Sequence, residues 1–77
     1  MKLEILTPDK EIYLGEASAI LFPGLDGLFA VLDRHAPMIA GLKKGKIKAE
    51  TPAGIQFFEI NGGVMEVNHN KVLVLAE

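Results

Sequence analysis

The chain has 77 residues, no cysteine and a formal net charge of −2, with a pI near 5.6. These values exclude a disulfide framework and a zinc site of Cys and His ligands, and they argue against nucleic-acid binding, which needs basic surface to neutralise phosphates. The length predicts one small domain, residues 1–77, and a hydrophobic fraction of 49 % indicates apolar surface beyond what its core needs.

The chain opens with two extended segments. Leu3 and Ile5 share one face of a strand predicted over residues 2–6, which is followed by a turn. Residues 11–22 are predicted to form a long extended segment with a bulge or bend at Gly15–Glu16, where the apolar alternation breaks. No apolar run exceeds five residues, whereas a membrane-spanning helix needs roughly 20. No membrane span is therefore predicted.

The stretch Pro23–Pro37 combines prolines and glycines with a short apolar run. Glycine admits backbone conformations closed to other residues, and proline fixes its own φ angle. The stretch is therefore predicted to hold a tight turn at residues 24–27, a strand over residues 28–32 and a rigid corner at Ala36–Pro37. Such a loop would present four polar side chains as a contact surface: Asp26, Asp33, Arg34 and His35.

The second half of the chain alternates between apolar and polar residues. Residues 46–50 are expected to place Ile47 and Ala49 inward, and residues 55–60 to place Phe58 and Ile60 inward. Residues 72–76 are apolar on both faces, which is typical of a strand sealed between two layers. Glycine-rich or polar corners and turns are predicted between these segments at residues 43–45, 51–54, 61–63 and 68–71.

These segments predict an all-β domain. The number of short strands and their regular spacing favour a flattened antiparallel β-sandwich or barrel of about eight to ten short strands. No linker, low-complexity segment or internal repeat divides it. Any function is therefore expected to lie on the β-domain itself.

Acid–base catalysis or a metal site would use Asp26, Asp33 and His35. The chain has no cysteine, and its serine and threonines lack a neighbouring base in sequence, so a nucleophile is missing. The turn at residues 23–27 lacks the Lys-Ser/Thr pair and the following helix of a phosphate-binding loop. A partner-facing loop is the favoured interpretation, and no catalytic, cofactor-binding or metal-ligating residue is predicted.

Phe57 and Ile55 are expected to lie side by side on an outward sheet face. The pair either contacts another protein or is covered by a second sheet layer, and the sequence leaves both interpretations open. Lysines at residues 43, 44, 46 and 48 form a small basic cluster. A solvated corner is favoured for this cluster over a contact with acidic groups or lipid headgroups.

Five motifs follow one another along the whole chain: Gly-Leu-Phe-Ala-Val-Leu at 27–32, His-Ala-Pro-Met at 35–38, Leu-Lys-Lys-Gly-Lys-Ile at 42–47, Gly-Gly-Val-Met-Glu-Val at 62–67 and Val-Leu-Val-Leu-Ala at 72–76. In this order and spacing they resemble the N-terminal β-sandwich domain of the epsilon subunit of F-type ATP synthases. Ala30, Asp33-Arg34 and Met38 depart from the commoner family residues, which concerns loop detail. The two-helix hairpin that follows in most members is absent from this sequence.

The resemblance implies a non-catalytic rotor subunit of the central stalk, which helps couple proton or sodium flow to ATP synthesis. It implies the gamma subunit and the membrane c-ring as partners, at the cytoplasmic face of the bacterial inner membrane, and no cofactor, nucleotide or nucleic acid as ligand. The candidate positions for the gamma interface are Thr7, His35, Ala36, Pro37, Met38 and the outward Phe57. The candidate positions for the c-ring interface are Asp26, Gly27, Leu28, Phe29, Asp33 and Arg34.

Two rival functions come from other classes of protein. A biotinyl or lipoyl carrier domain is also a small flattened β-barrel, but it would need a modified lysine exposed on a hairpin. Lys43-Lys44 lacks the expected flanking Met or acidic residues, and the two halves of the chain are not alike. A hydrolase using His35 with Asp33 is the third choice.

Overall fold

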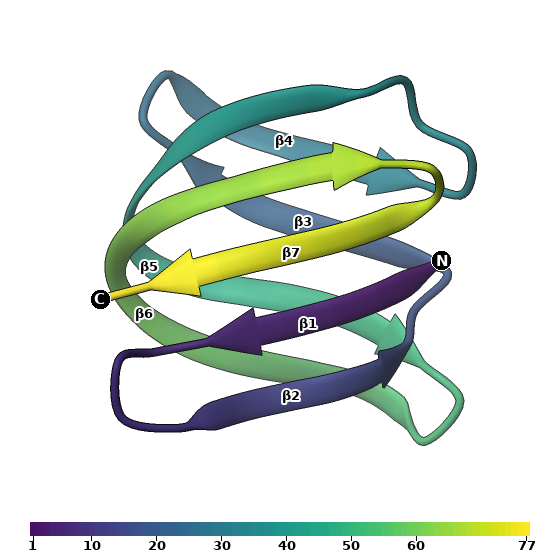
Figure 1. The fold of residues 1–77 in the computed structure, drawn as a ribbon, viewed down its shortest axis with the longest axis horizontal. Helices are drawn as coiled ribbons and strands as arrows, with labels where there is room; N and C mark the ends of the chain where they lie inside the picture. Colours follow the sequence, from purple (N-terminus) through teal and green to yellow (C-terminus); the bar gives the residue numbers. More distant parts are fainter.

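The computed structural model describes all of residues 1–77, and its secondary structure consists of strands alone (Figure 1). The predicted all-β fold is confirmed. The bounds of the seven strands are β1 Lys2–Leu6, β2 Glu11–Glu16, β3 Ala19–Gly24, β4 Gly27–Leu32, β5 Met38–Thr51, β6 Gly54–Asn68 and β7 Lys71–Ala76.

The seven strands form one sheet that folds over on itself, in the order β2-β1-β7-β6-β5-β3-β4. In Figure 1, β1, β2 and β7 lie in front, β3 and β4 lie behind, and β5 and β6 pass from one layer to the other. The body measures 25 × 24 × 18 Å, which fits the predicted flattened sandwich. We call its two outer surfaces the front face and the back face, following this view.

One pairing departs from the predicted antiparallel pattern. β1 and β7 run parallel, with Lys2 beside Lys71 and Leu6 beside Leu75. Only a hairpin connection forces two neighbouring strands to run antiparallel. Because the first and last strands are joined by no hairpin, they can meet in parallel at the centre of the front layer.

The strands are fewer than predicted because β5 and β6 are 14 and 15 residues long. The corners predicted at residues 43–45 and 61–63 lie inside these two strands, which bend there and continue. Gly62 and Gly63 have φ angles of 132° and 148°, values that residues with a side chain rarely adopt. A Cβ atom on Gly63 would also lie 2.9 Å from the Cα atom of Ala76. Glycine therefore permits both the bend of β6 and the close approach of β7.

Two further details differ from the sequence prediction. The segment predicted over residues 11–22 is two strands, and the break falls at Ala17–Ser18, where the chain crosses from the front layer to the back layer. The last strand is not sealed on both faces, since Val72 and Val74 are buried whereas Leu75 is 49 % exposed. No part of this chain covers the front face, so the apolar residues of β7 alternate between core and surface.

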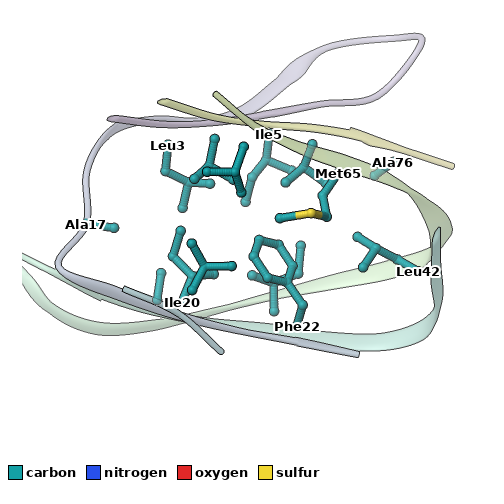
Figure 2. Close-up of a cluster of buried hydrophobic side chains, with 14 of the residues drawn as sticks. Leu3, Ile5, Ala17, Ile20, Phe22, Leu42, Met65 and Ala76 are labelled. Atoms are coloured by element: carbon teal, nitrogen blue, oxygen red, sulfur yellow. The ribbon is translucent and has the colours of Figure 1, made fainter. Parts of the chain in front are cut away.

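The core fills the space between the two layers and contains apolar side chains only (Figure 2). Leu3 and Ile5 point into it from the front layer, and Ile20 and Phe22 point into it from the back layer. Each fully buried side chain of this size contributes about 1.5–3 kcal/mol through removal from water. The inward positions predicted for Ile47, Ala49 and Ile60 are confirmed, and Phe58, also predicted inward, is half-buried against the core. The shared face of Leu3 and Ile5 is the buried face of β1.

Candidate interaction surfaces

The first candidate surface is the hairpin that joins β3 to β4. Its two turn residues, Leu25 and Asp26, lie between paired Gly24 and Gly27, as the sequence predicts. Gly27 has a φ angle of 123°, which suits glycine in a tight hairpin. The hairpin and the first residues of β5 enclose a groove of about 440 Å³, lined by Gly24–Phe29 and Met38–Gly41.

The groove exposes large apolar side chains to solvent. Leu25, Leu28 and Ile39 are 67 %, 69 % and 71 % exposed. Asp26 is the single charged residue of the groove, and its carboxylate forms no ion pair within the chain. The groove brings the predicted c-ring positions 26–29 together with one predicted gamma position, Met38.

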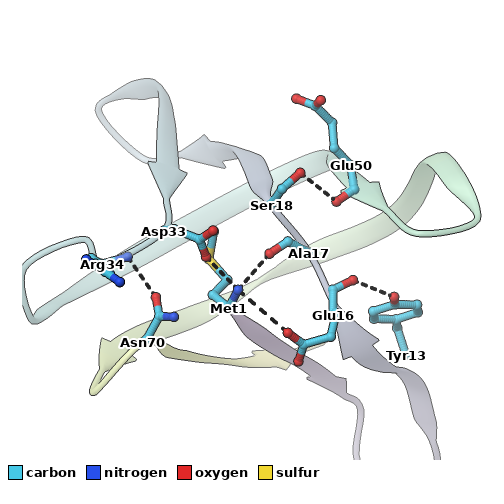
Figure 3. A network of polar contacts seen from close by, with 9 residues as sticks. All are labelled: Met1, Tyr13, Glu16, Ala17, Ser18, Asp33, Arg34, Glu50 and Asn70. Atoms are coloured by element: carbon cyan, nitrogen blue, oxygen red, sulfur yellow. Dashed lines mark hydrogen bonds and ion pairs between the residues drawn. The ribbon is translucent and has the colours of Figure 1, made fainter.

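The second candidate surface is the loop between β4 and β5, which a polar network holds in place (Figure 3). The α-amino group of Met1 lies 2.6 Å from Asp33 Oδ1 and 2.9 Å from the carbonyl oxygen of Ala17, to both of which it donates hydrogen bonds. Asn70, in the β6–β7 turn, accepts a hydrogen bond of 2.7 Å from the backbone N–H of Arg34. The loop is therefore tied both to the chain start and to a neighbouring hairpin.

The same network sets the ionisation of Asp33. The hydrogen bond from the Met1 amino group, together with its positive charge, holds the pKa of Asp33 below its ordinary value. Arg34 adopts a φ angle of 64°, in the left-handed region. The hydrogen bond from its backbone N–H to Asn70 Oδ1 supports this conformation of the β4–β5 loop. Asp33 and Arg34 thus shape the loop as well as carrying charge at its surface.

No catalytic arrangement forms around His35. Its Nδ1 lies 2.8 Å from the carbonyl oxygen of Ala36, and no hydrogen bond joins it to Asp33. The hydroxyl of Ser18 donates to the carbonyl oxygen of Glu50, 3.4 Å away, with no base beside it. No three His, Cys, Asp or Glu side chains gather in a group that could hold a metal ion. Geometry therefore does not support the hydrolase alternative.

The third candidate surface is the back face. Two rows of paired residues cross its strands, Ala30–Leu21–Lys48–Phe57 and Leu32–Ala19–Glu50–Ile55. Phe57 and Ile55 are 60 % and 57 % exposed, and Leu32 is 58 % exposed. The second layer of the sandwich lies on the other side of these strands and does not cover them. The fold therefore excludes the interpretation in which a second sheet layer covers Phe57 and leaves its side chain available for a contact outside this chain.

The structure separates some predicted site residues that the sequence placed together. Asp26–Phe29 lie at one end of β4, and Asp33 and Arg34 lie beyond the other end, about 17 Å away at 3.3 Å per residue. Thr7, in the β1–β2 turn, and His35, in the β4–β5 loop, lie at opposite ends of the molecule (Figure 1). The candidate positions for each partner are therefore spread along the molecule and do not form one compact patch.

Sequence reasoning missed the apolar residues that extend these surfaces. Leu25 sits in a two-residue turn, where polar residues are usual, so an apolar residue there was a signal of an exposed apolar surface. Leu32 and Ile39 could not be assigned a face without knowing which strand edges meet, whereas Leu28 was already named as a c-ring position. Lys43 and Lys44 lie inside β5, so neither is the lysine at a hairpin tip that the carrier alternative would need.

The chain matches the family model described as ATP synthase, Delta/Epsilon chain, beta-sandwich domain, over residues 1–77. It is 43 % identical over 77 residues to the ATP synthase epsilon chain of Chlorobium limicola, covering 99 % of this chain and 88 % of that one. It is 45 % identical over 78 residues to the epsilon chain of Sulfurimonas denitrificans, of which it covers 60 %.

Solved structures have the same fold. A chain in the cryo-EM structure of the Euglena gracilis mitochondrial ATP synthase, with OSCP, F1 and c-ring, aligns with a TM-score of 0.88 and 25 % identity over 96 % of this chain and 48 % of that one. A chain of the Tetrahymena thermophila central stalk and c-ring structure aligns with a TM-score of 0.80 at 21 % identity, over 97 % of this chain and 61 % of that one, which supports the fold alone.

The fold and the match over the whole chain thus define a β-sandwich domain of the ATP synthase delta/epsilon class. The chain belongs to the ATP synthase delta/epsilon family and corresponds to the N-terminal β-sandwich domain of its epsilon subunits. The structure contains no helix of the length and hydropathy that a membrane crossing requires.

Proposed function

We propose that the chain is a non-catalytic rotor subunit of the central stalk, which docks on the gamma subunit and the c-ring and helps couple ion flow to ATP synthesis. It would work as a peripheral protein at the cytoplasmic face of the bacterial inner membrane, without bound nucleotide or cofactor. Family membership supports this assignment, and the uncovered apolar back face is the observation that carries it. A rigid body with a permanent interface is what transmission of torque requires.

The two proposed partners would use different parts of the molecule. The back face exposes the apolar side chains of Leu32, Ile55 and Phe57 beside Lys48 and Glu50, and such apolar groups suit a permanent contact with gamma. The β3–β4 hairpin is narrow and ends in the unpaired carboxylate of Asp26, which suits a contact with polar loops of the c-ring. His35, Ala36 and Pro37 lie in the β4–β5 loop and Met38 lines the hairpin groove, and gamma would reach them from the back face.

The experiment that tests the gamma contact is a titration of purified gamma subunit with the wild-type chain, Phe57→Asp and Leu75→Asp. Both side chains are exposed and apolar, but Phe57 lies on the back face and Leu75 on the front face. We expect Phe57→Asp to weaken binding at least about tenfold, because a buried aspartate would lack a partner. The matched Leu75→Asp should bind within about twofold of wild type.

Two outcomes would contradict the proposal. Failure of the folded wild-type chain to bind gamma would remove the proposed function altogether. Equal loss of binding in the two variants would move the contact away from the back face. Circular dichroism of all three proteins controls for unfolding, which we do not expect because neither side chain belongs to the core.

A further inference from the structure

The free edge of β4 offers unpaired backbone groups. β4 pairs with β3 alone and is the last strand of the sheet. Gly24 and Gly27 flank a two-residue turn, and the residues at these positions of such a hairpin form a hydrogen-bonded pair. Hydrogen-bonded and non-hydrogen-bonded pairs alternate along β3 and β4 from this point. Leu28 and Ala30 therefore point their N–H and C=O groups away from β3. Pro23 has no N–H, and it lies opposite Leu28 in a non-hydrogen-bonded pair, where no N–H toward β4 is needed.

A second free edge faces the same groove. The carbonyl oxygen of Gly41 in β5 accepts a hydrogen bond of 3.1 Å from Leu25 N–H, and so the backbone groups of Gly41 point away from β6. Ile39, two residues earlier, points the same way and has no strand beside it. The groove of about 440 Å³ therefore has unpaired strand edges on both of its walls.

The sequence of β4 does nothing to protect its edge. Natural edge strands are usually blocked by charged residues, proline or a bulge, because free backbone groups attract other strands. Residues 27–32 contain no charge and no proline, and Leu28, Ala30 and Leu32 are all exposed. The other edge strand, β2, begins and ends with a glutamate.

We infer that the β4 edge is the pairing site for an extended, apolar segment of the gamma subunit, which adds a strand to the sheet. An extended backbone is the ligand whose alternating N–H and C=O groups match this edge. The inference rests on the proposed function, because Leu28 and Leu32 belong both to the edge and to the border of the back face. One partner can therefore cover both surfaces, while Asp26 at the tip of the β3–β4 hairpin remains available for the proposed c-ring contact.

A second copy of this chain is the less favoured occupant. A stable dimer needs roughly 800 Å² of buried surface on each partner. An edge of six residues is too short to provide that area alone, whereas a partner already seated on the back face needs only a short additional contact. Self-association therefore becomes an outcome of the test.

The test is the affinity for purified gamma of the wild-type chain, Ala30→Pro and Leu14→Pro. Proline at residue 30 removes an N–H that no internal bond uses, so the fold is kept while the edge is blocked. Leu14 provides the matched control on the other edge strand, β2. Met1 and Ala17 form a hydrogen-bonded pair, and pairs alternate along β1 and β2 from there. Leu14 therefore lies in a non-hydrogen-bonded pair and also points its N–H outward, away from β1. We expect at least about tenfold weaker binding for Ala30→Pro and less than about a twofold change for Leu14→Pro.

Amide hydrogen exchange of the wild-type complex tests the same inference without a variant. The N–H groups of Leu28 and Ala30 should exchange rapidly in the free chain and slow at least about tenfold when gamma binds. Strand addition would be overturned if the wild-type chain bound gamma while the exchange rates of Leu28 and Ala30 stayed unchanged, or if Ala30→Pro bound gamma as tightly as wild type. Either result would leave the proposed function standing. Absence of wild-type binding would overturn the proposed function itself. A gamma-independent dimer in sedimentation, lost in Ala30→Pro, would assign the edge to a second copy.

Discussion

The sandwich has two sides where strand edges face each other without pairing, and the two sides differ in how their side chains fill the gap. On one side the edge of β2 lies against β6, and the rings of Tyr13 and Phe58 meet there with their centroids 5.2 Å apart. The hydroxyl of Tyr13 donates to the carbonyl oxygen of Glu16, 3.0 Å away. On the other side the edge of β4 faces β5 across the groove, and no aromatic pair bridges the gap.

This difference separates the side of the sheet that supports the fold from the side where we propose that a partner binds. The β2 side buries its aromatic side chains partly and carries glutamates at its rim, so it resists pairing with other chains. The β4 side leaves Leu28 and Ile39 about 70 % exposed. Apolar groups kept in water contribute nothing to folding, and they gain free energy only when a partner covers them.

The largest expected loss of stability comes from a change that disrupts both sides at once, because both sides depend on the bend of β6. Gly63→Ala would force a side chain into a φ angle of 148° and against the backbone of β7. We expect a loss of more than about 3 kcal/mol in the free energy of unfolding, measured by urea denaturation. Gly54→Ala is the matched control, since its φ angle of 107° is strained but no atom lies within 4 Å, and should cost about 1 kcal/mol. Equal costs would show that the close approach of β7 is unimportant.

The second prediction sharpens the contrast between the sides. Phe58→Ala should lower the free energy of unfolding by about 2 kcal/mol, because a half-buried ring packed on the core is lost. Ile39→Ala, at the open side, should change it by less than about 0.5 kcal/mol, since that side chain is 71 % exposed. A comparable loss in both variants would mean that the open side also supports the fold. Thermal or urea denaturation measures both.

The smallest effect concerns the loop above the open side. The pKa of Asp33 is lowered in the folded chain, so its carboxylate contributes stability above the pKa of the unfolded chain and loses it as pH falls through the folded value. Asp33→Asn should therefore be less stable than wild type at pH 7, and the difference should shrink progressively in acid. Melting temperatures across this pH range measure it.

The control for this prediction is Glu16→Gln. Its Oε1 lies 3.9 Å from the same amino group and its side chain is largely exposed, so the pair is weak. The melting temperature of this variant should follow wild type at every pH. A difference between Asp33→Asn and wild type that stays constant with pH would indicate that geometry, and not charge, explains the role of Asp33.

Local patterns predicted most of the fold. Alternation identified the inward faces of β1, β5 and β6, and the Gly24–Gly27 turn gave the β3–β4 hairpin. The corners at residues 43–45 and 61–63 were wrong as strand ends, because a glycine can bend a strand as well as end it. The parallel pairing of β1 with β7 was also missed, since it joins segments about 70 residues apart and no local signal encodes it.

The candidate site was less predictable from sequence. Phe57 was recognised as outward because period-two alternation extends over residues 55–60. The separation of Asp26 from Asp33 follows from the straightness of β4, and their motif spacing does not reveal it. The role of Asp33 depends on the amino group of Met1, 32 positions away. Contacts of that kind appear only when the sheet is closed.

The sharing of β5 and β6 between the layers has a mechanical consequence. In a sandwich of two separate sheets, sideways force is resisted only by side-chain packing at the interface. Here the two strands run continuously from one layer into the other, and a ladder from Met38–Val67 to Thr51–Gly54 joins them along nearly their whole length. Sliding of the layers would have to stretch covalent backbone or break that ladder. A load applied at the front face would therefore reach the back face with little shear.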